Sequence, residues 1–358
     1  MSTPSLELLY EQRAKCSMTL KPSTGPGEIS ITKALSHLQR PFRTPDMVGV
    51  AMRALLANKL ADLPRPADGR TLQRWQALAE VGANDLSLAK VYEGHTDALA
   101  ILAELHGPIG QGIWAVWAAE TPQSRVKFLA GKHGGALYGT KAWCSGAALA
   151  DSALMTAWTQ DEQPILVALQ LRQPGLRIET QQWNAVGMSA TESATVILNG
   201  VPAVAVGGQG EYGGRPGFWQ GGAGIAAVWY GATVAIAKAL ATSSKVASDP
   251  HAAAHLGAMD STLRAARALL IETATWIDTH PMADTKSAAL RVRATVESTA
   301  NDVLQRTGRA LGPGLLCSDA IHAQRCADLP VFLRQSHAEH DLAALGQSVK
   351  GHSARWSL

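Results

Sequence analysis

The chain of 358 residues is long enough to bury a large core and to form two or three domains. Its formal net charge is only +3, without a concentrated Lys/Arg block, which argues against nucleic-acid binding. The longest apolar stretches, such as Ile225 to Ala237, are shorter than the roughly 20 residues that a membrane span requires. The segment Met1 to Tyr10 lacks the basic and apolar parts of a signal peptide. We therefore expect a cytoplasmic protein that binds neither nucleic acid nor membrane.

Cysteine usage argues against a disulfide framework or a zinc ribbon. The four cysteines are far apart and show no C-x-x-C spacing. They are Cys16, Cys144, Cys317 and Cys326.

The first block, residues 1–112, is predicted to be a helical domain. From about Leu72 to Leu105, apolar residues recur at the spacing of amphipathic helices. Gly82 and Gly94 interrupt this run, so we expect two or three helices.

The middle block, residues 113–206, has the short apolar runs of a β-domain, separated by Gly, Asp and Pro. Their spacing predicts a small β-barrel or sandwich of about 100 residues. The expected strands are Ile113 to Ala119, Leu137 to Ser145, Ala153 to Thr159, Ile165 to Leu171 and Thr195 to Leu198.

The last block, residues 207–358, opens with a glycine-rich connector and is then helical in pattern. Trp219 to Ser248 is rich in Ala and Gly, which suits closely packed helices. Asp249-Pro250 is a strong helix start, and we expect Asp284 to cap the next helix. A last helical stretch from Asp319 to about Lys350 completes an antiparallel four-helix bundle.

Three strings resemble signatures of the acyl-CoA dehydrogenase superfamily. Gly139 to Ala147, followed by Ala150-Asp151, resembles the family's Gly-x-Lys-x-aromatic, Ser/Thr and Ala-Asp pattern. Gly187 to Val196 is similar to the family's Gly-Met-Arg-Ala-Thr-Asp-Ser-x-x-Val. Arg325 to Gly346 resembles the end of the bundle, where the family places its active site. The resemblance spans residues 70–348 and implies an α+β fold: an N-terminal helical domain, a middle β-barrel and a C-terminal four-helix bundle.

The same resemblance implies a flavin cofactor, FAD with FMN as the alternative. Trp143 and Ser145 would lie against the isoalloxazine, because an aromatic ring packs on its face and a hydroxyl donates to a ring nitrogen. Trp117 begins the segment 117–120, whose backbone would meet the pyrimidine edge of the flavin.

The predicted pyrophosphate site departs from the family pattern. The family carries an Arg and a Phe-Gly shortly after the first bundle helix, whereas residues 242–250 contain neither. Lys245 is the cation in this segment, without the bidentate fork that suits a phosphate. FMN, weaker FAD binding and no flavin at all therefore stay open.

The usual catalytic base is also missing. In the family a Glu removes the proton α to a thioester carbonyl, within a Tyr-Glu-Gly string about eight residues after an Arg-Asp pair. Counting from Asp328 reaches Ser336, which is not a base. The string Tyr-Glu-Gly does occur at residues 92–94, but in the first helical block instead of the bundle, so we interpret it as a chance match.

Candidate replacements lie nearby, at His337, Glu339 and His340. On a helix the two histidines would share a face, with Asp341 four residues from His337. This His-x-x-His-Asp resembles flavin monooxygenases of the same fold, in which a histidine assists the flavin, as imidazole titrates near neutrality. No third metal ligand is evident, so we predict no metal. The alternative interpretation is a solvated face of a terminal helix.

His95, followed by Asp97, is predicted to line the substrate pocket, because helices of the first block cover the active site in the family. The alternative is a histidine that hydrogen-bonds within its own helical domain.

Three functions follow from this pattern. The leading one is dehydrogenation of an acyl thioester such as an acyl-CoA, or of a related small molecule, with Glu339 or a histidine as base. The second is monooxygenation with reduced flavin from a partner reductase, assisted by His337 or His340. The third is a non-catalytic paralogue that serves as a partner subunit. The resemblance also implies a homodimer or homotetramer and an electron-transfer or reductase partner.

Overall fold

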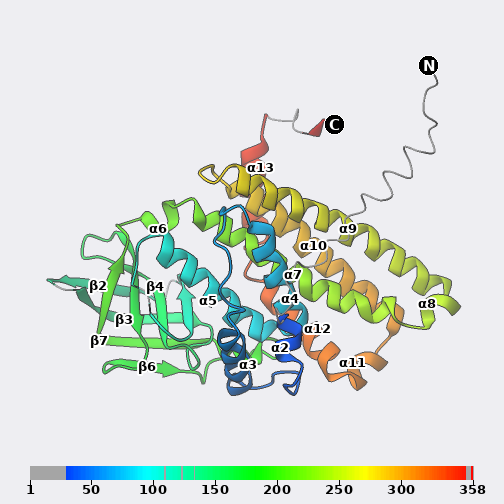
Figure 1. The fold of residues 1–358 in the computed structure, drawn as a ribbon, viewed down its shortest axis with the longest axis horizontal. Helices are drawn as coiled ribbons and strands as arrows, with labels where there is room; N and C mark the ends of the chain where they lie inside the picture. The colour runs from blue at the N-terminus through cyan, green and yellow to red at the C-terminus, as the bar shows by residue number, and fades with distance from the viewer. Residues whose placement is uncertain (1–29, 109, 122–123, 133, 352–355, 358) are drawn as a thin grey trace.

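The computed structural model describes residues 30–108, 110–121, 124–132, 134–351 and 356–357. In chain order it contains helices, a β-barrel and a helical bundle, so the predicted α+β class is confirmed (Figure 1). The expectations for Met1 to Tyr10 and Cys16 lie outside the described residues. The other three cysteines are free thiols.

The first block contains the helices α2 (Ile31–Leu35), α3 (Pro45–Ala57), α4 (Thr71–Asn84) and α5 (Leu86–Glu104). The break in the predicted run falls at Asp85, whose carboxylate accepts a 2.9 Å hydrogen bond from the backbone N–H of Leu88 and caps α5.

Gly82 and Gly94 do not interrupt the helices, contrary to the prediction. Gly82 lies inside α4, where a β-carbon would collide with the carbonyl oxygen of Val228 on α7 (Gly217–Ala241). Gly231 on α7 makes the reciprocal close approach to Ala79. These glycines therefore let two helix backbones touch, which is a packing function that a sequence pattern does not distinguish from a break.

The middle block is one sheet of seven strands. Six follow the order β1-β4-β2-β3-β7-β5, β6 pairs with β7 beside this path, and pairing of β4 with β5 closes the barrel. Its strands are β1 (Trp114–Trp117), β2 (Val126–Gly131), β3 (Gly134–Cys144), β4 (Ser152–Trp158), β5 (Pro164–Gln170), β6 (Leu176–Glu179) and β7 (Ala194–Val206).

Two strands were missed and one was predicted too short. β2 and β6 are largely exposed or intermediate in burial, so they lack a long apolar run. β7 continues past Leu198 through Gly200 and Pro202, which read as turn residues. Gly200 has φ +71° and lies at a register shift opposite Leu137 and Tyr138, so it forms a bulge within a continuous strand.

The bundle follows β7. Its helices are α6 (Glu211–Gly214), α7, α8 (Lys245–Ser248), α9 (Pro250–Thr279), α10 (Lys286–Leu311), α11 (Gly314–Ser318), α12 (Ala320–Leu333) and α13 (Glu339–Val349). The start of α9 is as predicted, with Asp249 accepting from the N–H of His251 at 2.8 Å. The cap position of α10 is Thr285, although Asp284 still accepts from the N–H of Lys286 at 2.9 Å.

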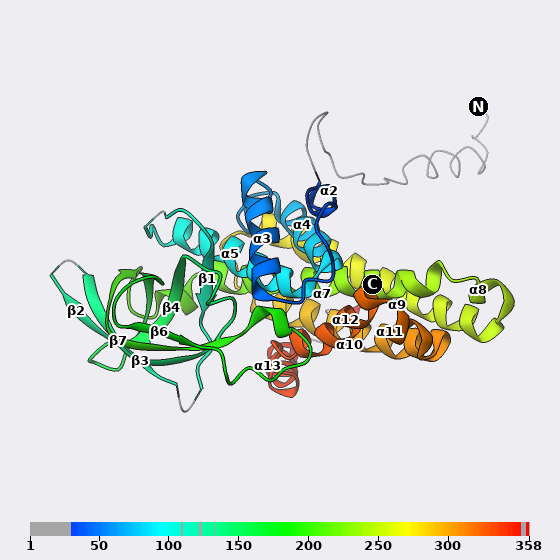
Figure 2. The same ribbon diagram turned by 90° about the horizontal axis from the view of Figure 1, so that it is seen from below.

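Residues 319–350 form two helices, not the single stretch that was predicted. α12 ends at Leu333, and α13 begins at Glu339 after a turn in which Ala338 has φ +45°. Figure 2 shows the barrel at one end of the molecule and α8 at the other, with α3 to α5 near the junction.

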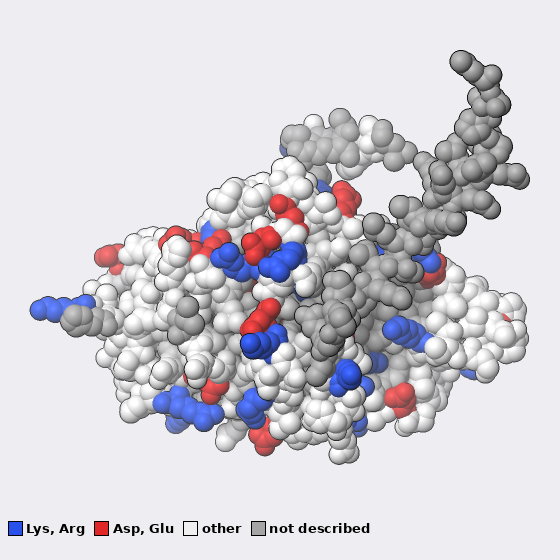
Figure 3. Space-filling view, in the orientation of Figure 1, with Lys and Arg blue, Asp and Glu red and all other residues white. Residues whose placement is uncertain are grey.

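Among the described residues, one helix, α7, is long and apolar enough to cross a membrane by length and composition. Within its apolar window, 72% is buried inside the protein, as expected of a central bundle helix. Basic and acidic side chains are interspersed on the face shown in Figure 3, which agrees with the small net charge.

Candidate functional site

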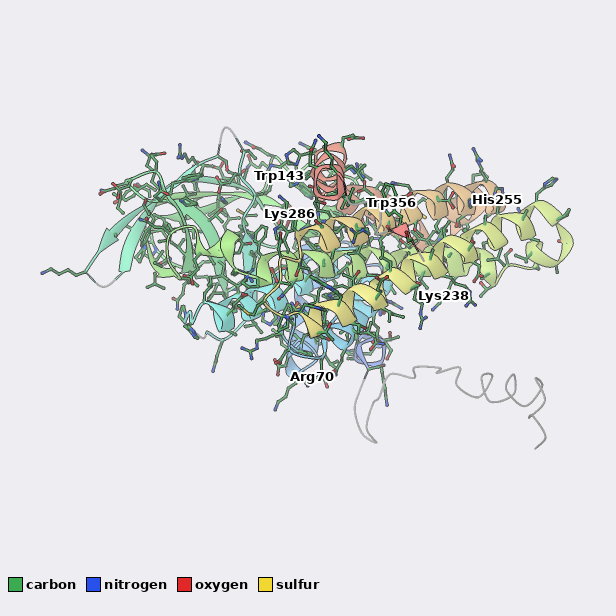
Figure 4. The ribbon with its side chains drawn as sticks, turned by 90° about the horizontal axis from the view of Figure 1, so that it is seen from above. Arg70, Trp143, Lys238, His255, Lys286 and Trp356 are labelled. Carbon is green, nitrogen blue, oxygen red and sulfur yellow. The ribbon has the colours of Figure 1, made fainter. Side chains whose placement is uncertain are left out.

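Trp143 presents an exposed indole where the barrel meets the helices (Figure 4). Its side chain is 64% exposed although the next residue, Cys144, is fully buried at the end of β3. Trp143 also has φ +63°, a left-handed conformation that is uncommon for a bulky residue. A large aromatic ring held at the surface by such a backbone offers its face to a flat ligand.

Ser145 follows Trp143 and belongs to a short chain of hydroxyls. Its Oγ lies 2.8 Å from Oγ of Ser193, which lies 3.2 Å from Oγ1 of Thr191. Trp117 is buried, and its indole N–H donates to the carbonyl oxygen of Ser145 at 3.2 Å. The indole of Trp117 therefore positions Ser145. Because this indole is buried, the part of the segment that can contact a ligand is the backbone that follows β1.

The segment after β1 is held by an ion pair between the buried Lys141 and the exposed Glu120. Nζ of Lys141 lies 2.6 Å from Oε1 of Glu120 and 2.7 Å from Oγ1 of Thr156, and the Lys141 side chain is fully buried. Burial lowers the pKa of Lys141, and Glu120 opposes this shift. Lys141 is the Lys of the first family string, so its role here is to fix the segment that was predicted to meet a flavin edge.

Asp328 joins the barrel to the bundle. Its Oδ1 accepts from the backbone N–H of Met188 at 2.5 Å and from Nε2 of Gln324 at 2.7 Å. Gly187 lies so close to α12 that a β-carbon would collide with the carbonyl oxygen of Ala327. Burial raises the pKa of Asp328, and the Met188 hydrogen bond opposes this shift. The sequence pattern did not reveal this role of Asp328, because its main partner, Met188, is 140 residues away in the chain.

His95 is buried in α5 against β1. Its Nδ1 accepts from the backbone N–H of Trp114 at 3.1 Å, and its Nε2 has no partner among the described residues. Burial lowers the pKa of His95 to about 4, so the imidazole is neutral at physiological pH. Because Nδ1 accepts, Nε2 carries the proton, and a buried N–H donor is left available to a ligand.

The three residues predicted to be catalytic lie together at the start of α13, but His337 precedes the helix. The prediction that His337 and His340 share one helix face is therefore wrong. Their rings lie edge to face, with the ring centroids 6.1 Å apart. Oδ1 of Asp341 lies 3.5 Å from Nδ1 of His337 and 3.9 Å from Nδ1 of His340. Both histidines and Glu339 are exposed, whereas Ser336 is buried.

Asp341 also gives this cluster a third ligand atom. Ligand atoms of His337, His340 and Asp341 lie within 4.8 Å of one another, a donor set that suits either acid–base chemistry or a divalent metal.

Lys245 lies far from the other candidate residues. It begins α8 at the end of the molecule opposite the barrel (Figure 1). Its Nζ donates to the carbonyl oxygens of Ala310 and Leu311, both at 3.3 Å, and so binds the C-terminal end of α10. Within one chain, Lys245 does not reach Trp143.

No protein-family model matches the sequence, and no curated protein sequence matches it. Solved structures do share the fold. TdsC from Paenibacillus sp. A11-2, in complex with FMN and indole, aligns with a TM-score of 0.74 and 16% identity over 86% of this chain and 91% of its own. Nitrososynthase from Micromonospora carbonacea var. africana gives 0.70 and 16%, over 84% and 89%. Methanesulfinate monooxygenase MsuC from Pseudomonas fluorescens gives 0.67 and 16%, over 87% and 92%. This chain has the acyl-CoA dehydrogenase-like fold that its sequence resemblance predicted.

Proposed function

We propose that the protein is a flavin-dependent oxidoreductase that acts as a monooxygenase on a small-molecule substrate, using reduced flavin and dioxygen. The observation that carries this choice is the set of ionisable groups around the site. Where a dehydrogenase of this fold would carry its catalytic base, this chain has Ser336, whose hydroxyl is buried. The neighbouring carboxylate, Glu339, is exposed. Imidazoles supply the acid–base groups instead, at His95 and at the start of α13.

The barrel edge suits a flavin. Trp143 offers a flat ring, Ser145 a hydroxyl, and Lys141 fixes the backbone segment that follows β1. When bound, reduced flavin would supply the two electrons that split dioxygen, so that one oxygen atom enters the substrate and the other leaves as water. FMN is favoured over FAD, because Lys245, the predicted pyrophosphate cation, binds α10 at the other end of the molecule.

His95 suits a hydrogen-bonding role in a water-poor site. Its neutral Nε2–H can donate to an oxygen atom of the substrate or of dioxygen without carrying a buried positive charge. The exposed His337 and His340 bring two imidazole groups into contact with solvent, where they can act as proton donors or acceptors.

Dehydrogenation of an acyl thioester is less well supported. An apolar acyl chain needs an apolar lining. Helix α5, from the block that covers the active site in the resembled family, instead carries the ion pair Lys90–Glu93 at 2.9 Å. Glu93 belongs to the Tyr-Glu-Gly string, and its bond to Lys90 gives it a partner within α5. The names of aligned structures also favour oxygenation: one TdsC structure is called dibenzothiophene monooxygenase, and MsuC is called methanesulfinate monooxygenase.

The remaining expectations become part of the proposal. A homodimer or homotetramer, a cytoplasmic location and a separate reductase that delivers reduced flavin all fit a monooxygenase of this kind. Analytical ultracentrifugation would test the assembly, which we propose forms in the absence of the reductase.

A stopped-flow experiment tests the reaction class. Protein in excess over reduced FMN is mixed with oxygenated buffer, and flavin reoxidation and hydrogen peroxide release are followed. We expect the protein to slow peroxide release relative to free FMN, and Trp143→Ala to abolish this protection. Two results contradict the proposal: anaerobic reduction of bound oxidised flavin by an acyl-CoA, which indicates a dehydrogenase, and no effect on flavin in either redox state, which indicates a non-catalytic subunit.

A further inference from the structure

A second cavity lies between the C-terminal half of α5, the start of α7 and the loop that joins α9 to α10. Its volume is about 530 Å³. Leu105, Pro216 and Met282 form part of its apolar wall. Its charged and polar lining consists of Asp97, Glu104, Gln220, Asp68, Glu211, Arg65 and Arg215. A cavity that combines apolar surface with polar groups able to orient a ligand has the composition of a small-molecule site.

Two of these polar groups are already engaged by the protein. Glu104 accepts from Nη1 of Arg215 at 2.5 Å and from the backbone N–H of Gly217, at the start of α7, at 3.0 Å. Gln220 donates from Nε2 to the carbonyl oxygen of Pro281 at 2.8 Å, which leaves its Oε1 as an acceptor. Glu104 therefore joins α5 to the start of α7, and the side-chain amide of Gln220 uses its donor but not its acceptor.

Asp97 is different. Among the described residues none donates a hydrogen bond to its carboxylate and none forms an ion pair with it. The carboxylate lies against α7, where a β-carbon on Gly221 would be 2.7 Å from Oδ1. Burial raises the pKa of Asp97, and the more distant charges of Arg74 and Arg215 oppose this shift. Asp97 is partly buried, and a carboxylate that is partly withdrawn from water without a partner destabilises the folded chain unless a ligand pairs with it.

We propose that this cavity binds the positively charged nitrogen of a small organic amine, an ammonium or guanidinium group, with Asp97 as its counter-ion. Oε1 of Gln220 provides a second acceptor, and the apolar wall accommodates the carbon skeleton. A divalent metal is a poorer match, because the other carboxylates of the wall already have partners within the protein: Glu104 pairs with Arg215, Asp68 with Arg70, and Glu211 accepts from the N–H of Gly208. That the amine is also the compound oxidised by the flavin rests on the proposed function alone.

Isothermal titration calorimetry with a matched pair of probes tests the site without any flavin, so its outcome is separate from that of the proposed reaction. The probes are 2-phenylethylamine and 2-phenylethanol at pH 7.5, which differ only in the ammonium group. We expect the amine to bind at least roughly tenfold more tightly than the alcohol, as charge-assisted hydrogen bonds do in partly buried sites. Asp97→Asn should abolish this preference.

Asp68→Asn is the matched control. Asp68 lines the same cavity but is exposed and lies 3.8 Å from Arg70, so its removal should leave the preference unchanged. A thermal melt provides a second measurement: Asp97→Asn should raise the melting temperature, since it removes a charge that lacks a partner. The proposal is overturned if the two probes bind equally, if the amine does not bind, if Asp97→Asn retains the preference, or if that variant is less stable than the natural chain.

Discussion

Two carboxylates in the helical region, one buried and one partly buried, have opposite surroundings. At the junction between barrel and bundle, the buried Asp328 accepts hydrogen bonds from Met188 and Gln324, beside the close approach of Gly187 to Ala327. In the cavity between α5 and α7, Asp97 accepts none from the described residues. The comparison separates two uses of a charge withdrawn from water: a carboxylate hydrogen-bonded within the protein fixes the fold, whereas one without a hydrogen bond is available to a ligand.

The largest expected effect on the free energy of unfolding comes from removing the carboxylate of Asp328. Asp328→Ala should lower the free energy of unfolding by about 4 kcal/mol, because two hydrogen bonds to a buried charged group are lost. Urea unfolding followed by Trp fluorescence measures this. Asp302→Ala, which breaks the i,i+4 pair with Arg306 on α10, is the control and should cost about 0.5 kcal/mol or less. Equal losses in both variants would contradict a structural role for Asp328.

A slightly smaller effect is expected at Asp85, which is buried like Asp328. Burial raises the pKa of Asp85 to about 6, from 3.8 in the unfolded chain. Between these values the folded protein holds a proton that the unfolded chain has released, so the free energy of unfolding falls as pH rises, by up to about 3 kcal/mol, and is constant above pH 6.

Asp85→Asn keeps an acceptor for Leu88 and removes the charge, so this fall should disappear. Urea unfolding at pH values from 4 to 7 measures the difference between the two proteins. The opposite contribution of His95, whose burial lowers its pKa, is common to both and cancels. An identical pH dependence in the two proteins would show that Asp85 does not titrate in this range.

Replacing Asp97 should change the free energy of unfolding in the opposite direction to replacing Asp328. Asp97→Asn should raise the free energy of unfolding at pH 7.5 by about 1 kcal/mol, because a partly buried charge without a partner is removed. The measurement is urea unfolding beside Asp328→Asn, which should be less stable than the natural chain. Two destabilised variants would remove the distinction between the two carboxylates.

The smallest effect is expected at Lys245. Lys245→Ala should lower the free energy of unfolding by about 0.5 kcal/mol, the usual worth of a cation at a helix C-terminus. FMN affinity should not change. A loss of flavin binding together with dimer formation would instead show that Lys245 acts on the flavin site of a neighbouring chain.

Much of the fold followed from local patterns. Apolar periodicity located α4, α5 and the long bundle helices, and Asp249-Pro250 marked the start of α9. The errors have one physical cause, since a local pattern does not say what a residue packs against. Gly82 permits close packing rather than ending a helix, and the break before α13 falls on Ala338, which is neither Gly nor Pro.

The site was only partly visible in the sequence. The string from Lys141 to Ser145 could be identified because its residues are adjacent and lie in one strand end. The importance of Asp328 and Asp97 could not, because it depends on contacts with Met188 and on closeness to Gly221, both distant in the chain. Charge spacing on α5 offered one usable signal: Lys90, Glu93 and Asp97 recur at helical spacing within a largely buried helix.

The most direct test of the central claim is anaerobic equilibrium binding of reduced and oxidised FMN to the purified protein, with Trp143→Ala beside it. We predict that reduced FMN binds at least roughly tenfold more tightly than oxidised FMN, and that the variant loses most of this affinity while its unfolding is unchanged. Stoichiometric, tight binding of oxidised FAD, or binding of neither redox form, would contradict a monooxygenase that receives reduced flavin at the barrel edge.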